Sequence, residues 1–391
     1  MTLQELMTRW NGYQIEMRRW FHQHPEESTK EVRTAERIRA ELDRAGIPWR
    51  PCGLGTGTLA RIEGAQPGRT ILLRGDIDAL SVNEETGLPY ASEVPGVMHA
   101  CGHDCHISML LTAAMIVNEI RDRLKGTIVF AFQPAEELGL GARAMIEEGA
   151  LEGVDACFGM HVWSDYPAGT VALRKGPMMA SGDQFKIHVR GKSTHGAQPQ
   201  LGADALIMGA AIAQNLQTIV SRETYPGATA VVTVGKFHSG TRFNVVAGTA
   251  ELEGTTRTFS PAVRDRFEEQ ITRIARSTAE AMRGTADVEY LRIVPVTVND
   301  PGMIDVVTGA AGKIFGDKGV IEADLQMGGE DFAFYQEKVP GAMVLLGVRN
   351  EACDAVWPQH HGCYKVDESV LVKGAALHVQ TALDFLGVDL Q

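Results

Sequence analysis

The sequence predicts an α/β protein built on a mostly parallel sheet, with a smaller α+β sandwich domain inserted in the middle of the chain. Up to about residue 182, short apolar runs alternate with helical patterns, as in a parallel sheet with crossover helices. From about 183 the order becomes strand, helix, two strands, helix, strand, which is typical of a small antiparallel sandwich. A length of 391 residues also indicates two domains.

The first part of the chain begins with two helices, expected at about 3–22 and 31–45. Four apolar runs are then expected to form buried strands: TGTLARI (56–62), TILLRGD (70–76), TIVFAFQ (127–133) and DACFGMHV (155–162). Helices are expected after His103 and at 141–149. Ligands of such sheets collect beyond the carboxyl ends of the strands. The polar residues that we expect there are Asp76, Asp78, Glu136, Glu137 and His161.

The inserted domain is expected at 183–294, and the sheet domain at 1–182 and 295–391. The run DQFKIHVRG (183–191) alternates apolar and polar residues, as a half-exposed strand does. The further elements expected are a helix at about 202–221, strands in ATAVVTVGKF and GTAELEGTTRTF, a helix at about 261–283 and a strand in ADVEYLRIV. The α/β pattern returns after about 296.

Composition excludes several classes of partner. The formal net charge of −12 argues against nucleic acid and anionic membranes, because both require a basic face. No stretch is apolar for long enough to span a membrane. The start, MTLQELMTRW, has no secretory pattern, so we expect a cytoplasmic protein. The six cysteines include no CxxC pair, so we expect free thiols, with one or two possible metal ligands.

Three short motifs point to a metal-dependent hydrolase: HACGHDCH at 99–106, QPAEE at 133–137 and GMHVW at 159–163. Zinc-type metals prefer sulfur, imidazole nitrogen and carboxylate oxygen, and these motifs supply all three. Cys101 and His103 precede a helix, whose N-terminus favours a thiolate. Hydrolysis beside a metal also needs a carboxylate that handles protons.

The Glu136–Glu137 pair can supply both a ligand and a base. If the backbone is extended there, the two side chains point in opposite directions, so one binds metal while the other faces the attacking water. Each motif taken alone also has a structural interpretation. Cys101 could be a buried thiol, the glutamates two solvated acids at a helix start, and His161 a hydrogen-bonded core histidine. All three motifs at strand ends together favour metal binding.

The remaining histidines are assigned by their surroundings. His360 and His361 are adjacent, and at most one of them is expected to reach a metal. His99 and His106 flank the site and are expected to support it rather than to bind the metal. The histidines without such neighbours are expected to be structural or to lie on the surface: His22, His24, His188, His238 and His378.

These motifs resemble the M20 family of metallopeptidases, in particular the amidohydrolase branch that includes hippurate hydrolase, bacterial N-acyl-amino-acid deacylases and plant auxin-conjugate hydrolases. The resemblance implies a catalytic domain with two metal ions and an inserted lid domain that often dimerises. It extends over almost the whole chain, through LRGDIDAL, HACGHDCH, FAFQPAEE, FGMHVW, MASGDQFKI, GKSTHGAQP, LQTIVSR, RFNVVAGTAELEGTTRTF and GGEDFAFY, in that order.

The resemblance also implies roles for individual residues. Glu136 would be the general base, and Asp78 would support the metal site from its second shell. Counting back four residues from Tyr364 makes His360, not His361, the last ligand. The implied metal ligands are Cys101, His103, Glu137, His161 and His360.

In the inserted domain, the resemblance implies that His195 stabilises the oxyanion in a partner subunit's site, and that Asn244 and Arg257 bind the substrate carboxylate. The chain departs from the family pattern at three points. The usual prolines after the final histidine ligand and after the lid asparagine are missing, and Gln200 stands where a histidine commonly follows the lid proline. These departures bear on the shape of the acyl and amino-acid pockets.

The expected function is therefore hydrolysis of N-acyl amino acids, with two divalent ions per subunit (Zn, Mn, Co or Ni) and a homodimer or homotetramer formed through the lid. A dipeptidase or carboxypeptidase on the same scaffold is an alternative, although such family members carry His-x-Asp where this chain has Cys-x-His. A binding protein on a decayed scaffold is another, but it would not need Glu136. The acyl group, the amino acid and the metal stay open.

Overall fold

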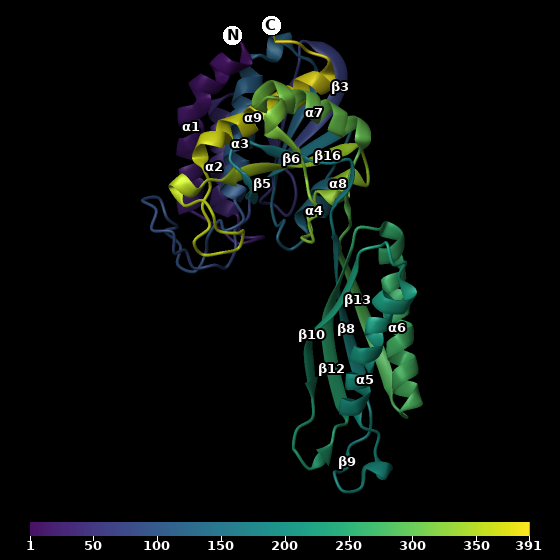
Figure 1. Cartoon of the computed structure of the whole chain (residues 1–391). Coiled ribbons are helices and arrows are strands. Elements are labelled where there is room, and N and C mark those ends of the chain that lie inside the picture. Colours follow the sequence, from purple (N-terminus) through teal and green to yellow (C-terminus); the bar gives the residue numbers. More distant parts are fainter. Residues whose placement is uncertain (391) are drawn as a thin grey trace. The chain divides into compact units, whose positions relative to one another are not determined.

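The computed structural model describes residues 1–390, which divide into two compact units (Figure 1). Unit 1 comprises Met1–Gly176, Val298–Asp324 and the described residues from Asp331 onward. Unit 2 comprises Pro177–Thr297 and Leu325–Glu330. The predicted fold class is confirmed, because one unit contains a mixed, mostly parallel sheet and the other a separate antiparallel sheet.

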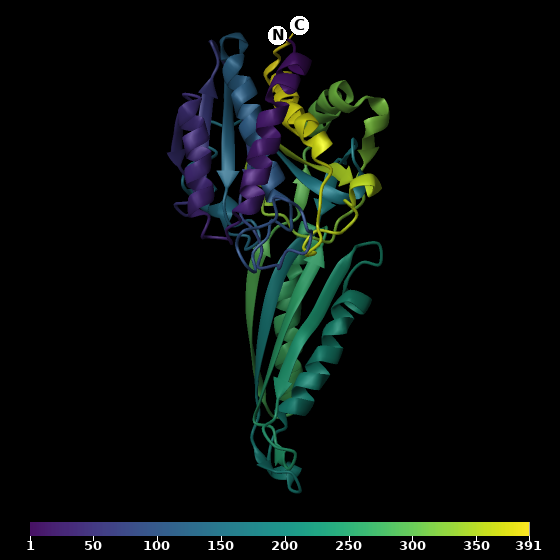
Figure 2. The ribbon, with the colours of Figure 1, turned by 90° about the vertical axis from the view of Figure 1, so that its left-hand side faces the viewer.

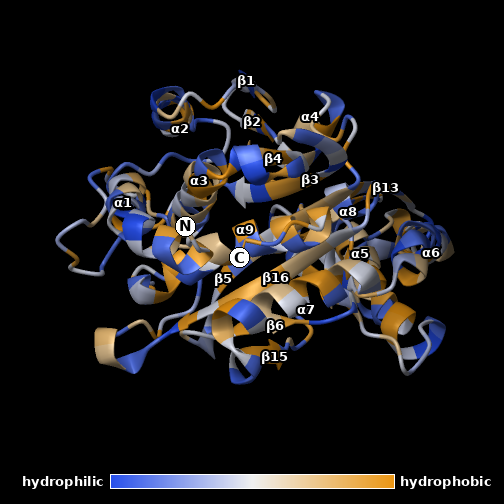
Figure 3. Cartoon of the chain, turned by 90° about the horizontal axis from the view of Figure 1, so that it is seen from above, coloured by the Kyte–Doolittle hydropathy of each residue, from blue (hydrophilic) through white to orange (hydrophobic). Residues whose placement is uncertain are grey.

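Unit 1 is built on an eight-stranded sheet with the order β1-β2-β4-β3-β5-β16-β6-β15. The central strands β4, β3, β5 and β16 run parallel, whereas β1, β2 and β6 make antiparallel pairs. The strands are β1 (Trp49–Pro51), β2 (Thr58–Glu63), β3 (Gln66–Asp76), β4 (Lys125–Gln133), β5 (Ala156–Pro167), β6 (Val171–Leu173), β15 (Val320–Glu322) and β16 (Gly341–Arg349). The hydrophobic colour of β16 in Figure 3 matches its burial at the centre of the sheet.

Helices cover this sheet. Helix α3 packs between α1 and α9, and α9 also contacts α7. Helices α4 and α8 pack together, α4 against β4 and α8 against β16 (Figure 1). Helices α1 (purple) and α9 (yellow) lie side by side (Figure 2). The helices are α1 (Leu3–Gln23), α2 (Val32–Arg44), α3 (His103–Glu119), α4 (Gly141–Glu147), α7 (Pro301–Phe315), α8 (Ala333–Gln336) and α9 (Leu371–Leu386).

Helix α3 is the inner helix of unit 1. Every residue from His103 to Val117 is buried, because the helix is apolar on all sides and has neighbours on all sides. Its first residue is His103, so the motif HACGHDCH lies at a buried helix N-terminus, next to the sheet. The fold thus brings this motif to the edge where the central parallel strands end.

The ends of the central strands differ from the expectation in one respect. Strands β3 and β4 end at Asp76 and Gln133, as expected for residues at a carboxyl edge. His161 was expected at a strand end, but β5 continues to Pro167. Strand β3 pairs with β5 only as far as Gly159, so His161 follows the paired part of β5 and is level with Asp76 at the end of β3.

Unit 2 is an antiparallel four-stranded sheet with the order β10-β12-β8-β13, packed against two helices. A short ribbon of β9 and β11 lies beyond one end of this sheet (Figure 1). The elements are β8 (Ser181–Arg190), β9 (Thr194–His195), α5 (Ala205–Thr218), β10 (Ala230–Ser239), β11 (Val245–Val246), β12 (Thr249–Thr258), α6 (Pro261–Ala281) and β13 (Thr285–Val294). Two short strands, β7 (Gly176–Met179) and β14 (Thr297–Asn299), lie where the chain passes between the units.

No helix within residues 1–390 is both long and apolar enough to cross a membrane. All six cysteines are free thiols, as the sequence predicts. Four of them are buried, including Cys101 at the start of α3.

Candidate metal centre

A glycine between Cys101 and His103 shapes the start of α3. Gly102 has a φ of 89°, in the left-handed region that disfavours other residues. An added Cβ would also lie 2.4 Å from Cγ2 of Val162. The turn therefore requires glycine, and it directs the side chains of Cys101 and His103 to one place.

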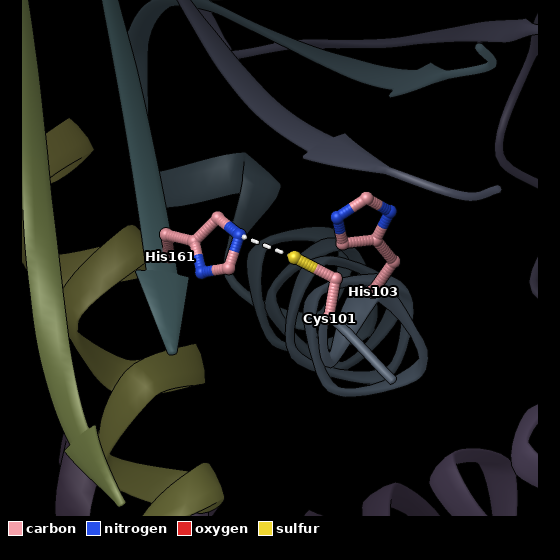
Figure 4. Close-up of side chains that lie close together, drawn as sticks. All are labelled: Cys101, His103 and His161. Carbon is pink, nitrogen blue, oxygen red and sulfur yellow. Dashed lines mark hydrogen bonds between the residues drawn. The ribbon is translucent and has the colours of Figure 1, made fainter. Parts of the chain in front are cut away.

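Cys101 and His161 face each other across the gap between α3 and β5 (Figure 4). Sγ of Cys101 lies 3.4 Å from Nε2 of His161. Nδ1 of His161 lies 2.7 Å from the carbonyl oxygen of Val162, to which it can donate. That bond leaves the lone pair on Nε2, directed towards the sulfur, as a metal-binding histidine requires.

His103 is oriented in a similar way by Asp78. Its Nδ1 lies 2.9 Å from the carbonyl oxygen of Asp78 and 3.2 Å from the carboxylate of the same residue. Its Nε2 is buried without a hydrogen-bond partner. A carboxylate and a carbonyl on one ring nitrogen, with the other nitrogen free, are the usual support for a histidine ligand.

Glu137 and His360 complete the group. Oε1 of Glu137 lies 3.5 Å from Nε2 of His360 and 3.9 Å from Nε2 of His103, and it too is buried without a hydrogen-bond partner. His361 points elsewhere, since its ring stacks on Trp357 and accepts the backbone N–H of Cys363. Of the two adjacent histidines, the structure thus brings His360 to Glu137.

These side chains form overlapping sets whose ligand atoms lie within 4.8 Å of one another. The sets are Cys101–His103–His161, Cys101–Glu137–His360 and His103–Glu136–Glu137. Two buried atoms that lack hydrogen bonds, on His103 and Glu137, face this group. Sulfur, imidazole and carboxylate ligands around buried unsatisfied atoms fit a divalent metal. Cys101, His103 and Glu137 each belong to two of these sets, so the sets form one continuous group.

The electrostatics also fit a cation. Burial and the negative charge of nearby carboxylates raise the pKa of the Cys101 thiol well above its usual range. Burial opposes protonation of His103, but the charges of Asp76 and Asp78 outweigh it and raise its pKa to about 10. Both groups thus carry protons that a divalent cation would displace.

The backbone of QPAEE is not extended. The two glutamates would point in opposite directions only on an extended segment, and the chain turns here, with Ala135 at a φ of 49°. Carboxylate oxygens of Glu136 and Glu137 both lie within 4.8 Å of a ring nitrogen of His103. The backbone N–H of Asp331 approaches Oε1 of Glu136 at 3.4 Å. Both glutamates therefore share one site.

His106 has no free nitrogen to offer the site, whereas His99 has both ring nitrogens buried without a hydrogen-bond partner and belongs to none of the ligand sets. Nδ1 of His106 pairs with Asp76, and its Nε2 accepts the backbone N–H of Val162 at 2.9 Å. Both His106 nitrogens are thus engaged. His99 is buried, and burial lowers its pKa to about 4, so it is a neutral side chain.

Several buried polar residues around the site had no role assigned from the sequence. Arg74 is fully buried between Asp76 and Asp331, and Asp331 also accepts from Gln133 and from the backbone of Ala142. Asp331 lies in GGEDFAFY, and the family resemblance of that motif was the only feature of the sequence that pointed to this residue. Glu31 accepts the backbone N–H of Ala135 at 2.9 Å across 104 residues of sequence, and no local pattern indicates that contact.

Unit 2 separates its candidate residues. His195 is exposed on β9, where it pairs with Val245, the residue after Asn244. Its Nδ1 accepts the N–H of Ala197 at 3.0 Å, which leaves Nε2 pointing outward. Arg257 lies near the opposite end of β12, paired with Gly182. Eight residues separate Thr249 from Arg257 on that strand, which corresponds to roughly 26 Å.

Comparisons with known proteins agree with this geometry. The model of peptidase family M20/M25/M40 matches residues 72–384. The chain is 41% identical over 368 residues to N-acetyl-L-cysteine deacetylase of Bacillus subtilis (strain 168), a match that covers 94% of this chain and 87% of that protein. It is 39% identical over 375 residues to thermostable carboxypeptidase 1 of Saccharolobus solfataricus, covering 95% of both.

Solved structures show the same architecture. The crystal structure of the Bacillus subtilis YXEP protein, described as a dinuclear metal binding peptidase from the M20 family, superposes with a TM-score of 0.86. The two chains are 36% identical, and the match covers 98% of this chain and 100% of that one.

Proposed function

The chain belongs to peptidase family M20/M25/M40 and is a hydrolase of amide bonds, and from this premise we propose that it is a metal-dependent amidohydrolase of N-acyl amino acids. The products would be a carboxylic acid and a free amino acid. The observation that carries the proposal is the convergence of buried sulfur, imidazole and carboxylate ligand atoms beside a second glutamate. The deacetylase relative supports the substrate class.

The proposed ligands are Cys101, His103, Glu137, His161 and His360. Together these residues would hold two divalent ions (Zn, Mn, Co or Ni) through sulfur, imidazole and carboxylate. When bound, such ions polarise the amide carbonyl and acidify water. Asp78 would act through His103, by fixing the ring with Nε2 directed at the site.

Glu136 is proposed as the group that moves protons. It would accept a proton from the attacking water and pass it to the nitrogen of the leaving amine, so that the amino acid departs as a neutral amine. The N–H of Asp331 contacts one oxygen of this carboxylate. Asp331 itself is fixed by its ion pair with buried Arg74.

The candidate residues of unit 2 are proposed to bind substrate and stabilise the transition state. His195 would donate from Nε2 to the developing oxyanion, while Asn244 and Arg257 would bind the substrate carboxylate. His195 and Asn244 are separated from Arg257 along unit 2 by much more than the length of an amino acid. This separation favours a homodimer or homotetramer in which one site receives these residues from two subunits.

A carboxypeptidase is the second candidate, because a relative of that name is 39% identical to the chain. Purified protein loaded with each metal in turn should be tested on N-acetyl and N-benzoyl amino acids and on dipeptides. We expect turnover of the N-acyl amino acids, with about two metal ions bound per subunit. Faster turnover of dipeptides would favour the peptidase, and no turnover of either class by metal-loaded protein would contradict both.

A further inference from the structure

We infer that Glu31 is a positioning residue for the two glutamates of the site, because its carboxylate fixes the backbone turn on which Glu136 and Glu137 stand. The inference rests on the proposed function for the meaning of those glutamates. The hydrogen bonds of Glu31 go to Thr29, Thr56 and Ala135 rather than to either glutamate or to a proposed metal ligand, although its charge is close enough to that of Asp78 to interact with it. It acts through one residue, Ala135.

The contacts of Glu31 connect three segments of unit 1. The residue is fully buried, directly before α2. Oε1 accepts the backbone N–H of Ala135 and that of Thr29, each at 2.9 Å. Oε2 accepts the hydroxyl of Thr56, also at 2.9 Å. Both oxygens are thus hydrogen-bonded, and the carboxylate cannot shift without breaking at least one contact.

The turn needs such an anchor because of Ala135. Its φ of 49° lies in the left-handed region, which an alanine occupies at a cost in free energy. Its side chain is buried, and its carbonyl oxygen accepts the N–H groups of Leu140 and Gly141. With its N–H bonded to Glu31, both polar groups of this backbone unit are used to hold the turn. Glu136 follows directly, so its direction depends on this conformation.

A second carboxylate holds the turn from the other side. Oδ2 of Asp78 accepts the backbone N–H of Glu137 at 3.1 Å. Asp78 also orients His103, so a variant there would change the metal site directly. Glu31 has no hydrogen bond to a proposed metal ligand, so a substitution of Glu31 is the better test of the turn.

Two substitutions of Glu31 distinguish the effect of side-chain length from the effect of charge. Glu31→Gln keeps the length, its amide oxygen can accept both N–H groups, and its NH₂ can donate to Thr56 if the hydroxyl reverses its role. Glu31→Asp keeps the charge but shortens the side chain by one methylene, so it loses contact with Ala135. Glu26→Asp is the matched control, because Glu26 accepts the N–H groups of Arg33 and Thr34 at the start of α2 and has no contact with the turn.

The expected result is near wild-type kcat for Glu31→Gln and a kcat lower by about 10- to 100-fold for Glu31→Asp. KM should change by less than about twofold, since substrate binding is not altered. Glu26→Asp should lower the melting temperature with kcat unchanged. Hydrogen exchange of the 134–141 segment should be faster in Glu31→Asp only.

Two outcomes would overturn the inference: equal kcat in Glu31→Asp and wild type, or equal kcat losses in Glu31→Asp and Glu26→Asp. A loss in Glu31→Gln with Glu31→Asp unaffected would assign the effect to charge and would also contradict it. If the wild-type protein hydrolyses no N-acyl amino acid, the proposed function fails instead. The hydrogen-exchange comparison then still decides whether Glu31 orders the turn.

Discussion

The two units differ in how closely their candidate residues lie together. In unit 1, residues from four distant segments converge on one group, buried except for Glu137 and the exposed His360, with Cys101 in contact with His161 and Glu137 in contact with His360. In unit 2, His195 is exposed on a ribbon at one end, and Arg257 lies near the other end of β12. The candidate residues of unit 1 therefore meet in one place, whereas those of unit 2 lie apart.

The difference follows from sheet topology. Parallel strands joined by crossover helices all end at one edge, so residues that follow different strands meet there. An antiparallel sheet distributes residues along its length, and positions eight residues apart on a strand lie roughly 26 Å apart. The motif residues of unit 1 therefore meet at one site, whereas those of unit 2 lie on two separate surfaces.

The largest expected effect belongs to Glu136, within the converged group. Glu136→Gln keeps the size of the side chain but cannot accept a proton, so kcat should fall by roughly 10⁴-fold or more, since two proton transfers are lost. Bound metal should stay near the wild-type amount. Glu137→Gln should lose metal as well as activity. Metal content by mass spectrometry and turnover, measured on the same samples, distinguish the two roles, and the reverse pattern would exchange the assignments.

His195 tests whether unit 2 acts on a separate subunit. His195→Ala should lower kcat by roughly 10²- to 10³-fold with little change in KM, because an oxyanion donor acts mainly in the transition state. His238→Ala is the control, as His238 is exposed on the neighbouring strand β10 of the same unit.

Mixed subunits sharpen this test. If His195 serves the partner, a dimer of one Glu136→Gln subunit and one His195→Ala subunit has one intact site of two. Random reassociation of equal amounts should then recover roughly a quarter of wild-type activity. No recovery from mixtures that form hybrid dimers would place His195 in its own subunit's site.

Arg257 should have a smaller effect, on binding. Arg257→Ala should raise KM by roughly 10- to 100-fold for substrates with a free carboxylate, since a charge-assisted contact is lost. The loss should shrink for the matching amide substrates, which lack the negative charge. Equal losses for acids and amides would assign carboxylate recognition to another residue.

The sequence predicted the fold class and the convergence of Cys101, His103 and His161, because parallel strands impose a common edge. It left the backbone of QPAEE open, since nothing local indicates that Ala135 adopts a left-handed conformation. The contact that accompanies this turn comes from Glu31, 104 residues earlier. Such long-range contacts of a single buried carboxylate leave no periodic pattern, and they become visible only once the segments are packed.

Cys101 offers the smallest but most direct test of the converged site. If its sulfur binds metal, alkylating reagents should modify it faster after treatment with a chelator, because removal of the ion leaves the sulfur free to react. Burial and nearby carboxylates raise the pKa of this thiol, so the metal-free protein should react faster as the pH rises, because more of the thiol is then ionised. Cys353 is exposed and belongs to none of the ligand sets, so its rate should be the same in both forms. Peptide mapping of the modified residues would measure both rates in one sample. Equal rates at Cys101 with and without chelator would mean that the sulfur is not a ligand. The residues that meet in unit 1 would then have to bind metal through imidazole and carboxylate groups alone.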